Sequence, residues 1–131
     1  MAPMSGEDAV ARIRAVCLGL PGAVEKAFGG HTAPSFRVGG KFFVMTSEDR
    51  LSITFKAAVG VQEALVAGDS RRFFVPAYVG HKGWVGARLD VEQDWQEMAE
   101  LIEDSYRMIA AKRLVAQLDE RRAQPTRRDP S

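Results

Sequence analysis

Residues 35–45 read Ser-Phe-Arg-Val-Gly-Gly-Lys-Phe-Phe-Val-Met, two β-prone runs joined by a pair of glycines. Two adjacent glycines between such runs predict a two-residue hairpin, because the favoured primed turns need positive φ. The segment that follows, residues 51–55, alternates and puts Leu51, Ile53 and Phe55 on one face. This alternation is typical of an antiparallel strand with one buried face. The centre of the chain is therefore predicted to be a hairpin-based sheet.

Helices are expected on both sides of these strands. Near the N-terminus, Ser5 is a candidate N-cap, and Pro21 and Gly22 are stop signals. Between them, apolar residues recur at helical spacing: Val10, Ile13, Cys17 and Leu20. A last helix is predicted from the N-cap Asp94 to about residue 118. Its expected buried face consists of Trp95, Met98, Ala99, Ile102, Tyr106 and Ile109.

The remaining segments complete the pattern. Short strands are predicted at residues 24–28, 71–76 and 84–89, a loop at 80–83, and a short helix around Val61, Leu65 and Val66. Hairpin-linked strands with helices near both termini predict an α+β fold, an antiparallel β-sheet packed against N- and C-terminal helices. Residues 1–118 are expected to form one domain, and residues 119–131 a disordered, polar, Arg- and Pro-rich tail.

Composition limits the class of protein. The chain has 131 residues, 46% of them hydrophobic and 27% charged, which fits one soluble domain. The N-terminus lacks the features of a signal peptide, and no apolar run is long enough for a membrane span. A single cysteine, Cys17, excludes an internal disulfide and fits a reducing compartment. We therefore expect a cytoplasmic protein without a membrane partner.

The net charge of +1 conceals a strong segregation along the chain. Residues 26–88 contain nine bases and four acids, whereas residues 89–104 contain seven acids and no Lys or Arg. The acids lie at the start of the last helix, where the helix dipole favours carboxylates. The basic excess predicts an anion-attracting surface if the bases share a face, and a solvated face partly paired with the acidic helix if they do not.

The candidate anion-binding residues are the bases and histidines of this region: Lys26, His31, Arg37, Lys41, Lys56, His81 and Lys82. No catalytic constellation is visible, and Cys17 is predicted to be buried and a poor nucleophile. The histidines lie in glycine-containing loops without the three or four ligands of a metal site. No catalytic activity, cofactor or metal is expected.

Residues 76–85, Pro-Ala-Tyr-Val-Gly-His-Lys-Gly-Trp-Val, look like the signature of the MmcQ/YjbR family. Further matches are Leu-Pro-Gly at 20–22 with Glu25, Phe-Arg-Val at 36–38, and Gly-Lys-Phe-Phe at 40–43, so the resemblance covers about residues 6–115. It implies an α+β fold similar to the frataxin-like CyaY arrangement, in a small bacterial cytoplasmic protein. Pro76, Gly83 and Trp84 match the motif and look structural.

The resemblance also implies a function, because DNA binding through a double wing of hairpins has been proposed for this family. The bases in the matching segments are Arg37, Lys41 and Lys82. We therefore expect a DNA-binding module that contacts phosphates through a basic hairpin or sheet surface, acting as a monomer or weak dimer. The alternative is a module for a small anionic ligand or a protein partner, with a groove formed by His31, Arg37, Tyr78, His81 and Lys82. Iron handling, by analogy with frataxins, is disfavoured. Frataxins use an acidic first helix and strand, whereas the acids here concentrate at residues 90–104, at the start of the last helix.

Overall fold

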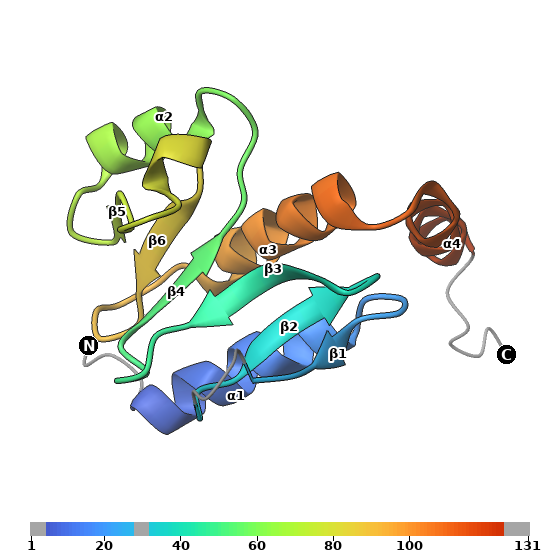
Figure 1. Cartoon of the computed structure of the whole chain (residues 1–131), viewed down its shortest axis with the longest axis horizontal. Helices are drawn as coiled ribbons and strands as arrows, with labels where there is room; N and C mark the ends of the chain where they lie inside the picture. Colours follow the sequence, from blue (N-terminus) through green and yellow to red (C-terminus); the bar gives the residue numbers. More distant parts are fainter. Residues whose placement is uncertain (1–4, 28–31, 125–131) are drawn as a thin grey trace, which may run out of the picture.

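The computed structural model describes residues 5–27 and 32–124 and has an α+β architecture (Figure 1). The helices are α1 (Gly6–Leu18), α2 (Val61–Gly68), α3 (Trp95–Ile109) and α4 (Lys112–Ala123), with a short 3₁₀ helix, η1 (Gly80–Lys82). The strands are β1 (Val24–Glu25), β2 (Ser35–Val38), β3 (Lys41–Thr46), β4 (Ser52–Phe55), β5 (Phe73–Phe74) and β6 (Val85–Arg88). The predicted fold class is confirmed.

The strands described here form one sheet in the order β1-β2-β3-β4-β6-β5, and every neighbouring pair is antiparallel. In Figure 1, α1 and α3 lie behind this sheet, and the opposite face is turned toward the viewer. Helices α1 and α3 also contact each other, and α3 packs on β3 and β4. Among the described residues, helices therefore cover one face of the sheet, and the other face has no helical layer.

The predicted hairpin is confirmed, with Gly39 and Gly40 at φ values of 60° and 80°. The register between β2 and β3 shifts between Phe36 and Arg37, which is a β-bulge. Phe43, the extra residue on β3, and its neighbour Val44 are both buried. A bulge allows two successive side chains to reach the same face, and here it supplies two core residues in a row.

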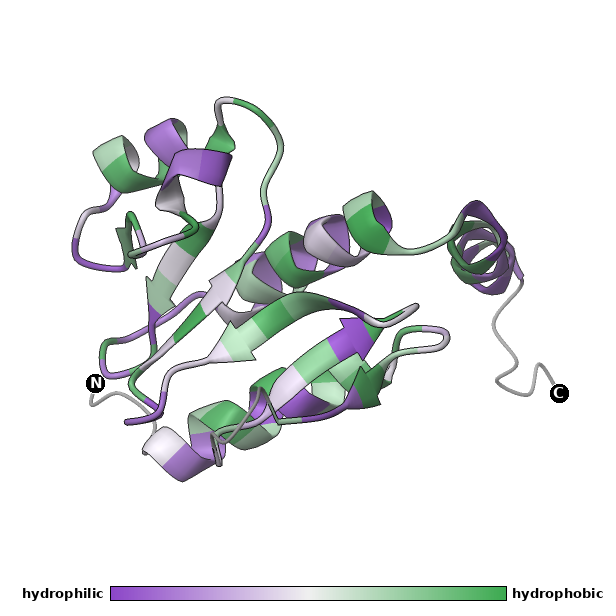
Figure 2. Cartoon of the chain, viewed as in Figure 1, coloured by the Kyte–Doolittle hydropathy of each residue, from purple (hydrophilic) through white to green (hydrophobic). Residues whose placement is uncertain are grey.

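The core lies between the sheet and the helices. Figure 2 shows hydrophobic and hydrophilic residues alternating around α1 and α3, and their hydrophobic positions supply much of this core. At its centre, the buried Tyr106 of α3 donates its hydroxyl proton to the Pro21 carbonyl over 2.6 Å and packs edge-on against Phe43, with ring centroids 5.6 Å apart. Cys17 is fully buried, as predicted, and burial raises the pKa of its thiol.

The predicted single last helix is wrong. The chain leaves the helical conformation at Ala110 and Ala111, where ψ is 150°, and α4 starts at Lys112. The break allows α4 to turn and place Leu114 and Leu118 against the core. Helix α4 continues to Ala123, so residues 119–123 are helical and do not belong to the predicted tail; residues 125–131 lie outside the described residues.

Other predicted elements differ in detail. Leu51 is 45% exposed, because it belongs to the turn before β4, where its N–H donates to the Asp49 carboxylate over 2.9 Å. The predicted loop at 80–83 contains η1. In α2, Leu65 and Val66 pack against the core, but the residue that is buried is Gln62. No helix in residues 5–27 and 32–124 combines the length and the apolar character needed to cross a bilayer.

Candidate functional site

The strand register divides the sheet residues between its two faces, because residues paired across neighbouring strands point to the same side. One set includes Val44, Phe55 and Val85, is fully buried and faces the helices. The other set occupies the uncovered side, which we call the open face. Its members are Val24, Lys26, Ser35, Arg37, Phe42, Met45, Ser52, Thr54, Phe74, Gly86 and Arg88.

Among the described strand residues, the ionisable ones on the open face are all basic: Lys26, Arg37 and Arg88. Lys26 follows β1 and continues its ladder, since its N–H donates to the Ser35 carbonyl over 2.8 Å. The carboxylate that the described strands contain is Glu25, which lies on the helical side and pairs with Arg14 of α1 at 2.8 Å. None of the three open-face cations forms an ion pair within the described part of the chain.

Both open-face arginines stack on aromatic rings. The Arg37 guanidinium carbon lies 4.1 Å from the centre of the Phe42 ring, and that of Arg88 lies 4.9 Å from the centre of the Phe74 ring. The Arg37 Nε is buried and has no hydrogen-bond acceptor among the described residues. The Phe74 ring lies against Gly86, where a Cβ atom would come within 2.3 Å of it. Stacking restricts the conformations of the guanidinium groups. It does not neutralise their charge as a carboxylate partner would.

The middle of the open face contains a hollow of about 400 Å³. Tyr78 lies at this hollow, with its side chain 93% exposed and its backbone at a φ of +66°. Glu48 is the carboxylate of the lining, and its Oε2 accepts hydrogen bonds from the N–H groups of Thr32 and Ala33. The remaining lining residues are neutral: Ala33, Ser35, Met45, Thr46, Ser47 and Thr54.

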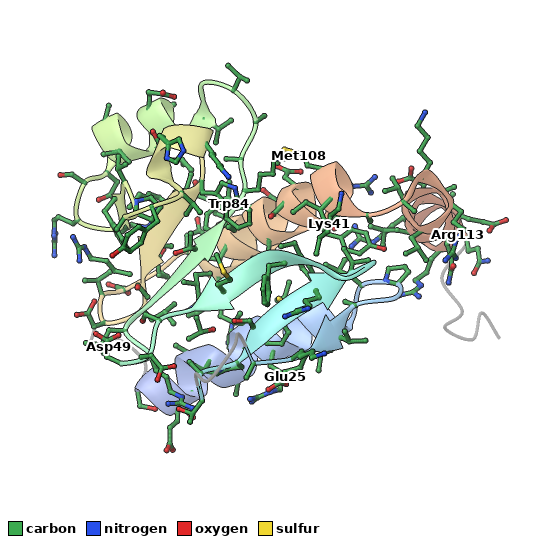
Figure 3. All side chains as sticks on the ribbon, in the orientation of Figure 1. Glu25, Lys41, Asp49, Trp84, Met108 and Arg113 are labelled. Carbon is green, nitrogen blue, oxygen red and sulfur yellow. The ribbon has the colours of Figure 1, made fainter. Side chains whose placement is uncertain are left out.

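The structure does not gather the sequence-predicted basic residues at one place. Lys26 and Arg37 lie on the open face, whereas Lys41 begins β3 at the hairpin, at the end of the sheet nearest α4 (Figure 3). Lys56 lines a different hollow beside α3, with Leu101, Asp104 and Met108 among its neighbours. His81 and Lys82 line a third hollow, beside α2. His31 lies outside the described residues.

These positions also bear on the predicted ligand groove. Tyr78 lines the hollow on the open face, His81 and Lys82 line the one beside α2, and Arg37 lines neither. The described members of the groove therefore do not share one of these hollows, and the groove stays a prediction because His31 lies outside the described residues. Arg88 is the open-face cation that the sequence reasoning missed; alternation along residues 85–88 would identify it only if the pairing of β6 with β4 were known.

The motif residues take part in turns and packing. Pro76 is buried, and Gly83 ends η1 at a φ of 86°. Trp84 is half-buried, and its carbonyl accepts from the Gln62 Nε2 over 2.7 Å, an atom that also donates to the Gly80 carbonyl over 2.8 Å. These contacts attach the segment to α2.

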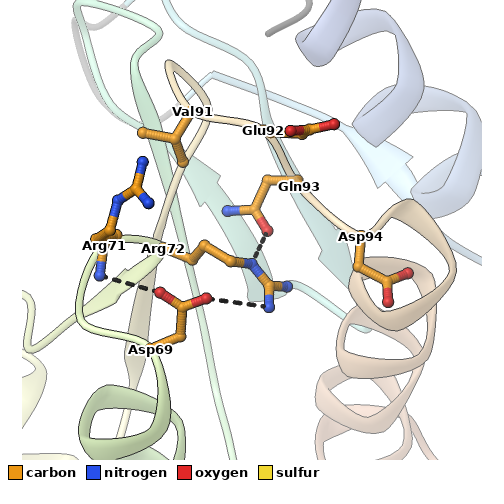
Figure 4. Close-up of a pocket in the computed structure, with 7 residues that line it drawn as sticks. All are labelled: Asp69, Arg71, Arg72, Val91, Glu92, Gln93 and Asp94. Atoms are coloured by element: carbon orange, nitrogen blue, oxygen red, sulfur yellow. Dashed lines mark hydrogen bonds and ion pairs between the residues drawn. The ribbon is translucent and has the colours of Figure 1, made fainter. Parts of the chain in front are cut away.

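A further hollow of about 400 Å³ lies between the turn at Asp69 and the start of α3 (Figure 4). Its Arg72 is already neutralised, since it bonds to Gln93 at 2.9 Å and pairs with Glu97 and Asp69. Carboxylates of Glu92 and Asp94 also line it. No group of three or more metal-ligating side chains occurs anywhere in residues 5–27 and 32–124.

Comparison with known proteins identifies the family. The YjbR family model matches residues 18–108. The chain is also similar to the crystal structure of the Deinococcus radiodurans protein DR2400, which carries the domain DUF419. The TM-score is 0.71 at 22% identity, over 84% of this chain and 87% of that one, so this likeness concerns the fold. No curated protein matches the sequence. Because the family model spans more than half of the chain, this protein belongs to the YjbR family.

Proposed function

We propose that this protein binds DNA through the open face of its sheet, with Lys26, Arg37 and Arg88 contacting phosphates. The observation that carries the proposal is the state of the two arginines. Each guanidinium stacks on a ring of the same face, and neither is paired with a carboxylate in the described residues. A planar guanidinium that is held in place and not neutralised suits bidentate contact with a phosphate.

The distribution of carboxylates supports the same proposal. Glu25, Glu97 and Glu103 all bond to arginines of the chain, and they belong to the β1 edge and to α3 on the helical side. The described strand residues of the open face therefore present cations to a polyanion, and the carboxylate near them is Glu48, in the lining of the hollow. Three phosphate contacts give a salt slope of about −2.1 to −2.7 in log–log form, which means a loss of roughly 20- to 40-fold between 50 and 200 mM salt.

The test measures the fluorescence anisotropy of a labelled oligonucleotide at several salt concentrations. Arg37→Gln and Arg88→Gln are each expected to weaken binding and to reduce the salt slope by about 0.7–0.9, one contact's worth. Arg113→Gln is the matched control, because it removes the same charge from an exposed position on α4, away from the sheet (Figure 3). The proposal fails if no binding occurs at tens of micromolar protein in low salt, or if Arg113→Gln weakens binding as much as Arg37→Gln.

The alternative is a small anionic ligand in the hollow of about 390 Å³ beside α2, because His81 and Lys82 line it together. Glycine backbone at Gly60 and Gly83 leaves room there for close approach, while Glu63 in the lining opposes an anion. Thermal unfolding with inorganic phosphate or nucleotides, compared between the wild type and Lys82→Gln, tests this alternative. A stabilisation that Lys82→Gln abolishes would support it.

Both versions describe a binding module without a catalytic step. We propose that it acts as a monomer or weak dimer in the bacterial cytoplasm, where the buried and free Cys17 would stay reduced. Sedimentation at two protein concentrations would reveal a stable dimer, which would contradict the oligomeric part of this proposal.

A further inference from the structure

We infer that the hollow beneath Tyr78 accepts an unpaired nucleobase of single-stranded DNA, stacked on the tyrosine ring. The inference rests on the proposed function and goes beyond it, because phosphate contact alone does not distinguish single strands from duplexes. It assigns the neutral part of the open face to a base and the basic part to the phosphates on either side.

The backbone of Tyr78 adopts a strained turn. The Val79 N–H donates to the Ala77 carbonyl over 2.7 Å, which closes a three-residue γ-turn around Tyr78. With a φ of +66° at its central residue, this turn is of the rare and strained kind. The turn is fixed on its C-terminal side, since the Val79 carbonyl accepts from the N–H of Lys82 over 3.0 Å. A strained conformation persists only where the surrounding structure imposes it, and such positions cluster at functional sites.

The ring of Tyr78 is exposed to solvent beside the hollow. Tyr78 is 93% exposed, although it is one of the large aromatic side chains that proteins usually bury in part. An exposed ring beside a hollow offers a flat stacking surface, and base–aromatic stacking is the usual basis of single-strand binding. The exposed ring thus favours a planar ligand, and the strained backbone favours a functional position over a solvated loop.

The lining and the size of the hollow suit a nucleobase. Among the described residues, no Lys or Arg lines the hollow. Its volume of about 400 Å³ is at the lower end of small-molecule pockets, which suits one base and not a peptide or a helix. Met45 and Thr54 form its floor on the open face and offer a neutral, partly apolar surface.

The hollow lies between cations of the open face. Lys26 lies in the same cross-sheet row as Ser35 and Met45, about 10 Å from Met45 across two strand spacings. Arg88 lies on the other side, on the strand next to the one that carries Thr54. A base in the hollow therefore has cations on both sides of it for the flanking phosphates. In a duplex the bases are stacked and paired, so none is free to enter.

The experiment compares three labelled probes of equal length: a mixed-sequence single strand of DNA, its duplex, and a single strand in which abasic sites replace the central nucleotides. The wild type is expected to bind the single strand at least 5-fold more tightly than the abasic strand, which carries the same phosphates, and more tightly than the duplex. Tyr78→Phe should bind within about 2-fold of the wild type, and Tyr78→Ser should lose about 5- to 100-fold on the intact strand only. The salt slope should stay unchanged in both variants.

Val75→Ser is the control for loss of an exposed apolar side chain, because Val75 is 56% exposed in the same segment and does not line the hollow. Circular dichroism verifies that each variant folds. Equal binding of intact and abasic strands, with no effect of Tyr78→Ser, would overturn the inference while leaving the phosphate contacts of Arg37 and Arg88 in place. Absence of binding to all three probes would overturn the proposed function and this inference together.

Discussion

The substitution Ser105→Ala removes a hydroxyl that connects α3 to two strands. Ser105 is fully buried; its Oγ accepts from the Lys56 N–H over 3.0 Å and donates to the Phe43 carbonyl over 2.7 Å. Both backbone groups lie where the ladder is interrupted, since Phe43 is the extra residue of the bulge and Lys56 follows the last residue of β4. Alanine therefore leaves the part-buried Lys56 N–H and the buried Phe43 carbonyl without this partner.

The expected cost follows from the two orphaned groups. A buried polar group left unsatisfied costs about 1–3 kcal/mol. With about 1 kcal/mol for the part-buried Lys56 N–H and the full range for the buried Phe43 carbonyl, the free energy of unfolding should fall by about 2–4 kcal/mol. With an unfolding entropy of about 2.1 cal/mol/K per residue, this corresponds to a drop in Tm of about 7–15 °C for a chain of this length.

Urea unfolding, followed by tryptophan fluorescence, measures this change. Ser52→Ala is the matched control, because it removes the same hydroxyl from a half-buried open-face position where the side chain makes no hydrogen bond in the described structure. The control should change stability by no more than about 0.5 kcal/mol. A loss below about 1 kcal/mol for Ser105→Ala, or an equal loss for Ser52→Ala, would refute the role assigned to the buried hydroxyl.

Three further predictions concern stability. Gly40→Ala should destabilise the protein by about 1–2 kcal/mol in urea unfolding, because φ at Gly40 is +80°. Gly68→Ala is the control: an added Cβ would have no atom within 4 Å at either position, but Gly68 lies in helix α2, so this variant should be neutral or slightly more stable. Tyr106→Phe should cost about 1–3 kcal/mol in the same assay, because the buried Pro21 carbonyl loses its donor, and an unchanged midpoint would argue that water replaces the hydroxyl. Cys17 holds its proton more tightly in the folded state, because burial raises the pKa of its thiol. The contribution of this raised pKa to the free energy of unfolding is therefore complete below the unfolded thiol pKa of about 8.5 and declines above it by about 1.4 kcal/mol per pH unit. Cys17→Ala should remove that part of the pH dependence of stability in urea unfolding.

Local elements of the fold could be predicted because their signals are local. The two glycines determine the hairpin turn, and Ser5 caps α1 by accepting from the Asp8 N–H over 3.1 Å. The break after α3 has no such signal, since Ala110 and Ala111 both favour helix. Tertiary packing overrides that preference, because α4 must turn to place its apolar residues on the core.

The candidate site could not be predicted in the same way, because it depends on pairing between distant strands. Arg88 joins the open face only because β6 pairs with β4, across a segment that contains α2, β5 and η1. Arg37 and Phe42 meet on that face because the bulge leaves Phe43 without a partner in the register. Neither the crossover nor the bulge is visible in hydrophobic alternation.

The net charge of +1 is a poor guide to what this protein attracts, because the fold separates the charges that cancel in the sum. The sheet lies between the open face and the carboxylates of α3, and screening reduces interactions beyond about 8 Å at physiological salt. A phosphate at Arg37 or Arg88 therefore responds mainly to the cation beside it. For the same reason, most of the basic excess of residues 26–88 acts at no single site, since Lys41, Lys56 and Lys82 lie elsewhere. What distinguishes the open face is that none of the described strand residues on it is a carboxylate, and the salt slope of binding, not the net charge, is the quantity that reports it.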